Sequence, residues 1–209
     1  AFTGAEQTLV KSYLESGRFL FTSGSEIGYD LSGQGSAGDN QFYTNYLKAD
    51  YISDAAGSNV YSGYGVDNSI LDGVTGITFD NGSQGTYDVD WPDGILPVGG
   101  ASTCAKYLGV NYASQGGMGI EYVGTFGSGN VDGGLVYLAV GFEAIYPESK
   151  RNEIMVDIMN LYESQLGIEE NNPATVPSSL SIHKLYPNPT NTSFTLEFSS
   201  PLNELITIT

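Results

Sequence analysis

The first thirty residues contain a helix signal, a glycine, a short apolar run and a glycine-rich turn in direct succession, and this order constrains the fold more than any other feature. Thr3 and Glu6 have the spacing of a capping box, which predicts a helix over residues 4–16. The apolar residues of that helix fall on one face: Leu9, Val10, Tyr13 and Leu14. Residues 18–22 follow as a short strand and residues 23–28 as a turn. The succession predicts an α/β domain with a parallel sheet.

The rest of this domain continues the same pattern around an irregular insertion. Helices are expected over residues 40–48 and 149–165, where apolar side chains form a stripe. Further strands are expected at residues 105–110, 119–123 and 134–140. The last of these is nearly all apolar, which is typical of a central strand covered on both faces. Between residues 51 and 97, many Gly, Asn, Asp and Ser residues separate short runs, so we expect short strands and long loops there.

A change of composition predicts a second domain. Residues 168–180 carry two prolines, polar side chains and no periodicity, as linkers do. The domains are therefore expected at residues 1–167 and 181–209. In the second, Pro187 and Pro189 hold the backbone extended. Alternating apolar residues then predict a strand over residues 194–198.

Charge and cysteine content exclude several classes of function. The chain has 24 acidic and 7 basic residues, a formal charge of −17, so nucleic acid and anionic membranes would repel it. Cys104 is the single cysteine, which excludes an intramolecular disulfide and a thiolate metal cluster. No run of about 18 apolar residues is present, so no transmembrane helix is expected.

The C-terminal phrase Tyr186-Pro187-Asn188-Pro189, followed by a polar stretch and an alternating strand, resembles the start of the type A C-terminal sorting domain of the type IX secretion system of Bacteroidota. The resemblance implies a sorting signal, with the type IX machinery as partner and a secreted or outer-membrane surface location in a Gram-negative bacterium. That family's domain is a small β-sandwich. Only about two strands fit before residue 209, so a partial sorting domain is expected.

Residues 1–167 resemble the class I glutamine-amidotransferase-like domain of secreted Bacteroidota proteins. The likeness lies in three phrases, at residues 14–31, 86–92 and 134–143. It implies a flavodoxin-like, doubly wound sheet. The family's sheet begins with strands upstream of the first helix, so we expect this domain to be N-terminally truncated.

The same resemblance implies a catalytic triad whose residues this chain lacks. Active members carry a nucleophilic Cys at a sharp strand-to-helix turn, with a His and a carboxylate near the last core strand. Here the turn, residues 23–25, reads Ser-Gly-Ser, and residues 141–145 contain no His. His183, the sole imidazole, lies beyond the linker. The amidotransferase triad is therefore expected to be absent.

Ser25 is the remaining catalytic candidate, with Glu26 or Glu143 as its base. A carboxylate of pKa near ~4 is a poor base for a hydroxyl unless burial raises that pKa. The alternative is that the turn is structural and that Glu26 only braces it. Cys104 leads into an expected strand, where a buried, unreactive thiol is common.

Two weaker binding hypotheses come from the residues around Trp91. Asp88, Asp90 and Asp93 could offer oxygens to Ca²⁺, although the twelve-residue calcium loop pattern is not present, and no other cofactor is expected. Trp91 itself could stack on a sugar or pack in the core.

The sequence thus predicts an exported accessory or interaction module with an unknown ligand. The alternatives are a non-catalytic portion of a secreted hydrolase that degrades polysaccharide, peptidoglycan or peptide, with its catalytic domain upstream, or a cryptic hydrolase that depends on Ser25.

Overall fold

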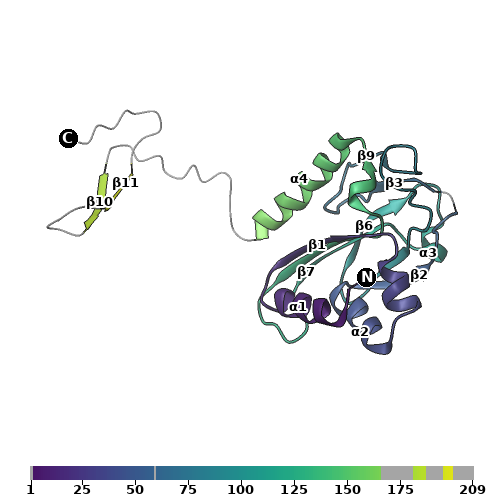
Figure 1. The fold of residues 1–209 in the computed structure, drawn as a ribbon, viewed down its shortest axis with the longest axis horizontal. Helices are drawn as coiled ribbons and strands as arrows, with labels where there is room; N and C mark the ends of the chain where they lie inside the picture. The colour runs from purple at the N-terminus through teal and green to yellow at the C-terminus, as the bar shows by residue number, and fades with distance from the viewer. Residues whose placement is uncertain (1, 59, 166–180, 187–194, 200–209) are drawn as a thin grey trace. The chain divides into compact units, whose positions relative to one another are not determined.

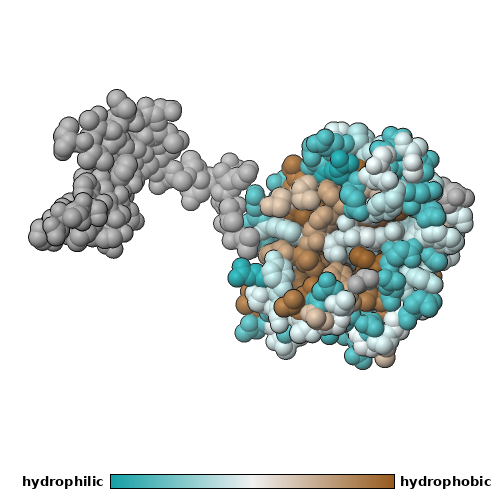
Figure 2. Space-filling model, viewed as in Figure 1, coloured by the Kyte–Doolittle hydropathy of each residue, from teal (hydrophilic) through white to brown (hydrophobic). Residues whose placement is uncertain are grey.

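The computed structural model of the chain describes residues 2–58, 60–165, 181–186 and 195–199. The chain divides into two compact units, residues 1–165 and 166–209, which are described separately below. In the first unit, hydrophilic surface surrounds a band of hydrophobic surface (Figure 2).

A seven-stranded sheet forms the centre of the first unit (Figure 1). Its strands, in spatial order, are β1 (Phe19–Ser23), β8 (Gly133–Leu138), β7 (Gly119–Gly124), β6 (Ser102–Tyr107), β3 (Ser62–Gly65), β4 (Ile77–Phe79) and β9 (Ile145–Tyr146). Only β1 and β8 pair in parallel, and each other neighbouring pair is antiparallel. A separate antiparallel pair consists of β2 (Ala49–Ser53) and β5 (Gly94–Pro97).

Four α-helices accompany the sheet within the described part of this unit. They are α1 (Gly4–Glu15), α2 (Ala37–Tyr46), α3 (Tyr112–Gln115) and α4 (Glu148–Gln165). The predicted capping box starts α1, because the Thr3 amide donates to Glu6 at 2.7 Å and the Glu6 amide donates to the Thr3 hydroxyl at 3.4 Å. A second capping box, between Ser36 and Asp39, starts α2 earlier than the expected residue 40.

Strand β8 is buried on both faces, as its apolar sequence predicted, although it is the second strand from the edge of the sheet and not its centre. One face packs against α1 and α2 through Leu135 and Tyr137, and the opposite face packs against α4 through Val136 and Leu138. Figure 1 shows α1 and α2 on one side of the sheet and α4 on the other. The alternation of strand side chains therefore divides the interior into two hydrophobic clusters.

The α/β class expected from the sequence is confirmed, in the form of a mixed sheet. The parallel arrangement expected throughout is restricted to β1 and β8. Strands β6, β7 and β8 follow one another in the chain and pair as antiparallel neighbours, without the long crossover over a sheet face that joins parallel strands. Residues 51–97 hold only short strands between loops, as predicted.

The second unit contains the antiparallel pair β10 (Ser181–Tyr186) and β11 (Thr195–Ser199). The strand predicted over residues 194–198 is β11, displaced by one residue. Tyr186 is the last residue of β10 and pairs with Thr195, whereas Pro187, Asn188 and Pro189 lie outside the described residues. No helix in the described ranges is both long and apolar enough to cross a membrane.

Candidate functional site

The parallel pairing of β1 with β8 brings the two candidate catalytic segments to one edge of the sheet. The turn after β1 and the 3-10 turn after β8 (Phe142–Ala144) meet there: the Gly24 amide donates to the Leu138 carbonyl at 3.0 Å, and the Phe142 amide donates to the Ser23 hydroxyl at 3.2 Å. The carboxyl ends of parallel strands are where α/β proteins bind ligands. This edge of the sheet is therefore the candidate functional site.

Ser25 lies in the turn after β1 with its backbone engaged and its side chain free. Its carbonyl accepts a hydrogen bond from the Asp93 amide at 2.9 Å. Across residues 2–58 and 60–165, the structure gives the half-buried Ser25 hydroxyl no hydrogen-bond partner. A nucleophilic serine needs a base within hydrogen-bond reach, and this geometry supplies none.

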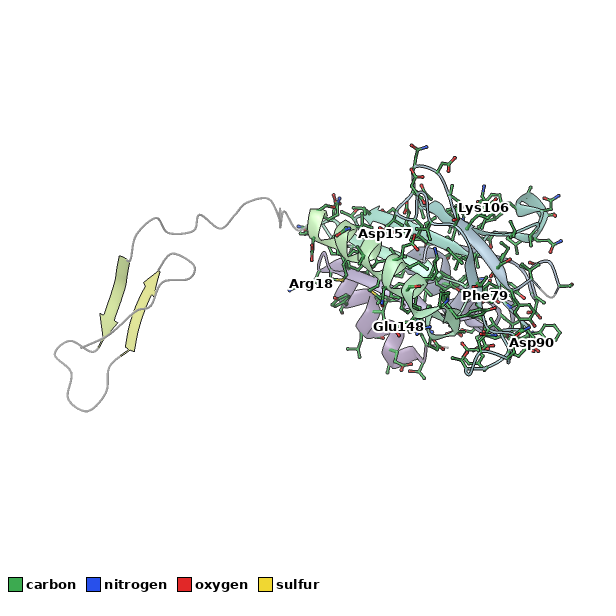
Figure 3. The ribbon with its side chains drawn as sticks, turned by 90° about the horizontal axis from the view of Figure 1, so that it is seen from above. Arg18, Phe79, Asp90, Lys106, Glu148 and Asp157 are labelled. Atoms are coloured by element: carbon green, nitrogen blue, oxygen red, sulfur yellow. The ribbon has the colours of Figure 1, made fainter. Side chains whose placement is uncertain are left out.

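Glu26 belongs to a group of carboxylates that we call the acidic loop cluster, made of Glu26, Asp54, Asp90 and Asp93. Burial raises the pKa of Glu26, and the charges of Asp54, Asp30 and Asp90 raise it further, in that order. The described residues include no basic partner in an ion pair with this cluster. In Figure 3, Arg18 and Asp90 lie at opposite ends of the first unit. The cluster thus carries mutual repulsion that no ion pair among the described residues offsets.

Asp93 is the most deeply buried residue of the cluster, and its side chain has no exposed surface. One carboxylate oxygen accepts from the Gly28 amide at 2.6 Å and the other from the Tyr29 amide at 3.3 Å. Burial raises the pKa of Asp93 to about 8; the two amides oppose this shift, whereas the charges of Glu26 and Asp54 add to it. Asp93 therefore fixes the start of the single π-helical turn (Tyr29–Gly33).

Two buried tyrosines complete the surroundings of Asp93. The Tyr107 hydroxyl donates to the Asp93 carbonyl at 2.8 Å. The Tyr43 hydroxyl is buried with no hydrogen-bond partner among the described residues. A Cβ atom on Gly28 would lie 2.6 Å from that hydroxyl and 3.0 Å from Asp93 Oδ2, so only glycine fits there.

Glu143 lies after β8, as expected, but its partner is a tyrosine. The Tyr87 hydroxyl donates to Glu143 Oε1 at 2.9 Å. Burial, together with this carboxylate, raises the pKa of Tyr87 to about 12. The carboxylate thus holds the loop that contains Tyr87, and Glu143 itself is exposed.

The three aspartates considered for Ca²⁺ lie in different surroundings. Asp88 accepts from the Tyr61 hydroxyl at 2.7 Å, Asp90 is exposed, and both oxygens of Asp93 face backbone amides. Over the described ranges, no group of three or more His, Cys, Asp or Glu side chains could hold a metal ion. Trp91 is 52% exposed, so it is not a core residue.

The remaining candidates, Cys104 and His183, belong to other elements of the chain. Cys104 is fully buried in the hydrophobic cluster beneath α4, and burial, with the charge of Glu121, raises the pKa of its thiol. The structural interpretation of Cys104 is confirmed. His183 lies on β10, in the second unit. The first unit therefore presents no thiolate or imidazole to the Ser25 turn within its described residues.

Sequence reasoning missed the contacts that organise this edge. The sequence suggests Asp93 only as a Ca²⁺ ligand, and it does not single out Tyr43, Tyr87 or Asp54 as site residues. The one available signal was Gly28, a glycine directly before a helical segment. The sequence does not show that Gly28 lies against the Tyr43 hydroxyl, and this contact is the reason that a residue without a Cβ atom is needed there.

Comparisons with known proteins give little further information. No protein-family model matches the chain, and no curated protein matches it. A solved structure described as the mmIFT52 N-terminal domain is similar to it at 18% sequence identity, with 78% of this chain and 72% of that chain covered and a TM-score of 0.49. A likeness at that TM-score carries no conclusion about fold or function.

Proposed function

We propose that this chain is an exported accessory or interaction module that carries a type IX secretion sorting signal. The observation that carries the proposal is the phrase Tyr186-Pro187-Asn188-Pro189 followed by the alternating sequence of residues 194–198. The antiparallel pairing of β10 with β11 on either side of this phrase is compatible with a sorting domain built from β-strands. The partner in export is the type IX machinery, and the destination is the medium or the outer-membrane surface of a Gram-negative bacterium.

We further propose that the first unit is a divergent member of the amidotransferase-like, flavodoxin-like domains. Two features support this relationship: the parallel pair β1 and β8, and helices on both faces of the sheet. The sheet differs from a doubly wound parallel sheet in its antiparallel strands, which are β7, β6, β3, β4 and β9. The proposed relationship is therefore a divergent one.

The geometry favours binding over catalysis at the carboxyl ends of β1 and β8. The Ser25 hydroxyl lacks a base and Glu143 is bonded to Tyr87, so the elements of an acyl-transfer site are not assembled among the described residues. The exposed carboxylates of Asp54 and Asp90 in the acidic loop cluster instead form no ion pair among the described residues. We propose that a positively charged group of a ligand binds there, beside the exposed Trp91.

Export is the part of this proposal that can be tested most directly, by comparing the intact gene product with a form that lacks residues 181–209. Enzyme assays on Ser25 and Glu143 variants separate the binding module from a cryptic hydrolase.

A further inference from the structure

Two loop segments meet at the carboxyl end of β1. We call residues 25–29, which follow β1, the β1 turn, and residues 87–93, which precede β5, the β5 loop. The side chain that anchors the β1 turn in a hydrophobic cluster is Ile27. A short segment with so few apolar contacts opens at a lower free-energy cost than the strands of the sheet.

A single residue, Asp93, holds the β5 loop against the β1 turn. Its amide donates to the Ser25 carbonyl at 2.9 Å. Its carboxylate oxygens accept from the Gly28 amide at 2.6 Å and from the Tyr29 amide at 3.3 Å. Within the described part of the chain, every hydrogen bond between these two segments involves Asp93. Their contact therefore depends on the state of this residue.

Acidic and phenolic groups surround the Asp93 carboxyl group. Glu26 on the β1 turn and Asp54 after β2 lie within electrostatic reach of it. So do four tyrosines, one each from α2, β2, β6 and β8: Tyr43, Tyr51, Tyr107 and Tyr137. Asp93 forms no ion pair with any residue that the structure describes. A negative charge on Asp93 is therefore stabilised by backbone amides and opposed by its acidic neighbours.

Burial decides the outcome of this competition. It opposes ionisation more strongly than the two amides favour it, and the charges of Glu26 and Asp54 add to its effect, so the pKa of Asp93 rises to about 8. Below that pH the closed arrangement holds a neutral carboxyl group. An acceptor for its proton lies close by, because the position of a Cβ atom on Gly28 is 3.0 Å from Asp93 Oδ2 and 2.6 Å from the Tyr43 hydroxyl oxygen.

Separation of the two segments brings this carboxyl group into water, where its pKa is near 3.8. Between about pH 4 and about pH 8 the open arrangement has therefore lost a proton that the closed arrangement keeps. The equilibrium constant for opening rises about tenfold for each pH unit in that window and is constant above it. Rising pH thus favours the open arrangement.

We propose that Asp93 is a pH-sensitive latch between the β1 turn and the β5 loop: its neutral carboxyl group keeps the two segments together, and its ionisation lets them separate. Glu26 lies on the first segment and Asp90 on the second, so opening also moves two carboxylates of the acidic loop cluster apart. The latch goes beyond the proposed function, because it requires neither export nor a ligand.

Amide hydrogen exchange of the full chain, followed by NMR between pH 5 and pH 9, tests the latch at the two amides that bind the carboxyl group. The measured quantity is the protection factor, which is the exchange rate of an unfolded amide divided by the observed rate at the same pH. For Gly28 and Tyr29 it should fall about tenfold per pH unit up to about pH 8 and then level off. Asp93→Asn keeps a carbonyl oxygen as acceptor but does not titrate, so its protection factors should change by less than about twofold per pH unit.

Urea separates the latch from unfolding of the whole first unit, which the same carboxyl group also influences. Exchange that requires global unfolding accelerates in low concentrations of urea, because much surface is exposed. The amides of Gly28 and Tyr29 should keep their exchange rates, whereas amides of β8 should exchange faster. An equal response to urea at both places would show that Asp93 acts only on the stability of the whole unit, and the latch would be wrong.

Glu26→Gln keeps the test decisive if Asp93→Asn does not fold. It removes the neighbouring charge that raises the pKa of Asp93 most, so the protection factor of Gly28 should level off at a lower pH than in the wild type. Asp72→Asn, in an exposed loop outside the cluster, should leave that pH unchanged. A wild-type protection factor at Gly28 that does not vary with pH, or equal slopes in the wild type and Asp93→Asn, would overturn the proposal.

Discussion

The carboxylate of Asp93 lies 2.6 Å from the amide nitrogen of Gly28, a residue 65 positions earlier in the chain. This bond connects the loop before β5, which carries Asp90 and Asp93, to the turn after β1, which carries Glu26. It therefore stabilises the arrangement of the acidic loop cluster. It also places a fully buried carboxyl group next to Glu26 and Asp54, whose charges act on it.

The first prediction concerns pH. Because the pKa of Asp93 is about 8 in the folded chain and 3.8 ordinarily, the folded state binds more protons between these values. The contribution of Asp93 to stability is therefore complete below pH 3.8 and is lost as the pH rises through 8. We expect the free energy of unfolding to fall by a few kcal/mol, on the order of 1.4 per unit of pKa shift, over that window.

Urea unfolding of the wild type and Asp93→Asn at pH 5 and pH 8 checks this prediction. The variant should lose less stability than the wild type between the two pH values, whatever its absolute stability. Parallel losses in both proteins would show that Asp93 does not titrate in this window.

The second prediction concerns the close approach of Gly28 to Tyr43. Gly28→Ala places a Cβ 2.6 Å from the Tyr43 hydroxyl, and we expect a loss of about 1–3 kcal/mol of unfolding free energy. Tyr43→Phe removes a buried hydroxyl that makes no hydrogen bond of normal geometry among the described residues and interacts only with the Tyr137 hydroxyl, so the variant should be close to neutral in stability. In the double variant, Gly28→Ala should lower the free energy of unfolding by less than it does in the wild-type background. Thermal unfolding of all four proteins measures this coupling, and strict additivity would contradict the geometry.

Much of the first unit could be predicted from local sequence, and the candidate site could not. The spacing of Thr3 and Glu6 gave the start of α1, and the unbroken apolar run of β8 gave a strand covered on both faces, because both signals are local. The pairing of β6, β3 and β4 depends on contacts between distant segments. The same holds for the bonds of Asp93 to Gly28 and of Tyr87 to Glu143, which join residues 65 and 56 positions apart.

The third prediction concerns repulsion within the acidic loop cluster. Burial is the largest cause of the raised pKa of Glu26, and the charge of Asp54 is the next. Asp54→Asn should therefore lower the pKa of Glu26 and that of Asp93. Carboxyl-carbon NMR titrations measure both values directly. Asp72→Asn, another exposed loop aspartate outside the cluster, is the control; an equal shift in that variant would mean that Asp54 acts only through net charge.

The fourth prediction concerns chemistry at the Ser25 turn. Because the Ser25 hydroxyl has no base and Glu143 is engaged by Tyr87, we expect glutaminase and esterase rates at background in the wild type, Ser25→Ala and Glu143→Gln. The assays use glutamine and a p-nitrophenyl ester as substrates. Turnover in the wild type that disappears in both variants would make Ser25 a nucleophile and favour the hydrolase.

The central claim is export through the C-terminal residues, and the most direct measurement is the distribution of the protein between periplasm, cell surface and medium in a host with the type IX system. The gene product is compared with a form that lacks residues 181–209 and with Pro187→Ala combined with Pro189→Ala. We predict that the intact protein reaches the surface or the medium, that the deleted form stays in the periplasm, and that the double proline variant is exported less. Equal export of the intact and deleted forms would contradict the account.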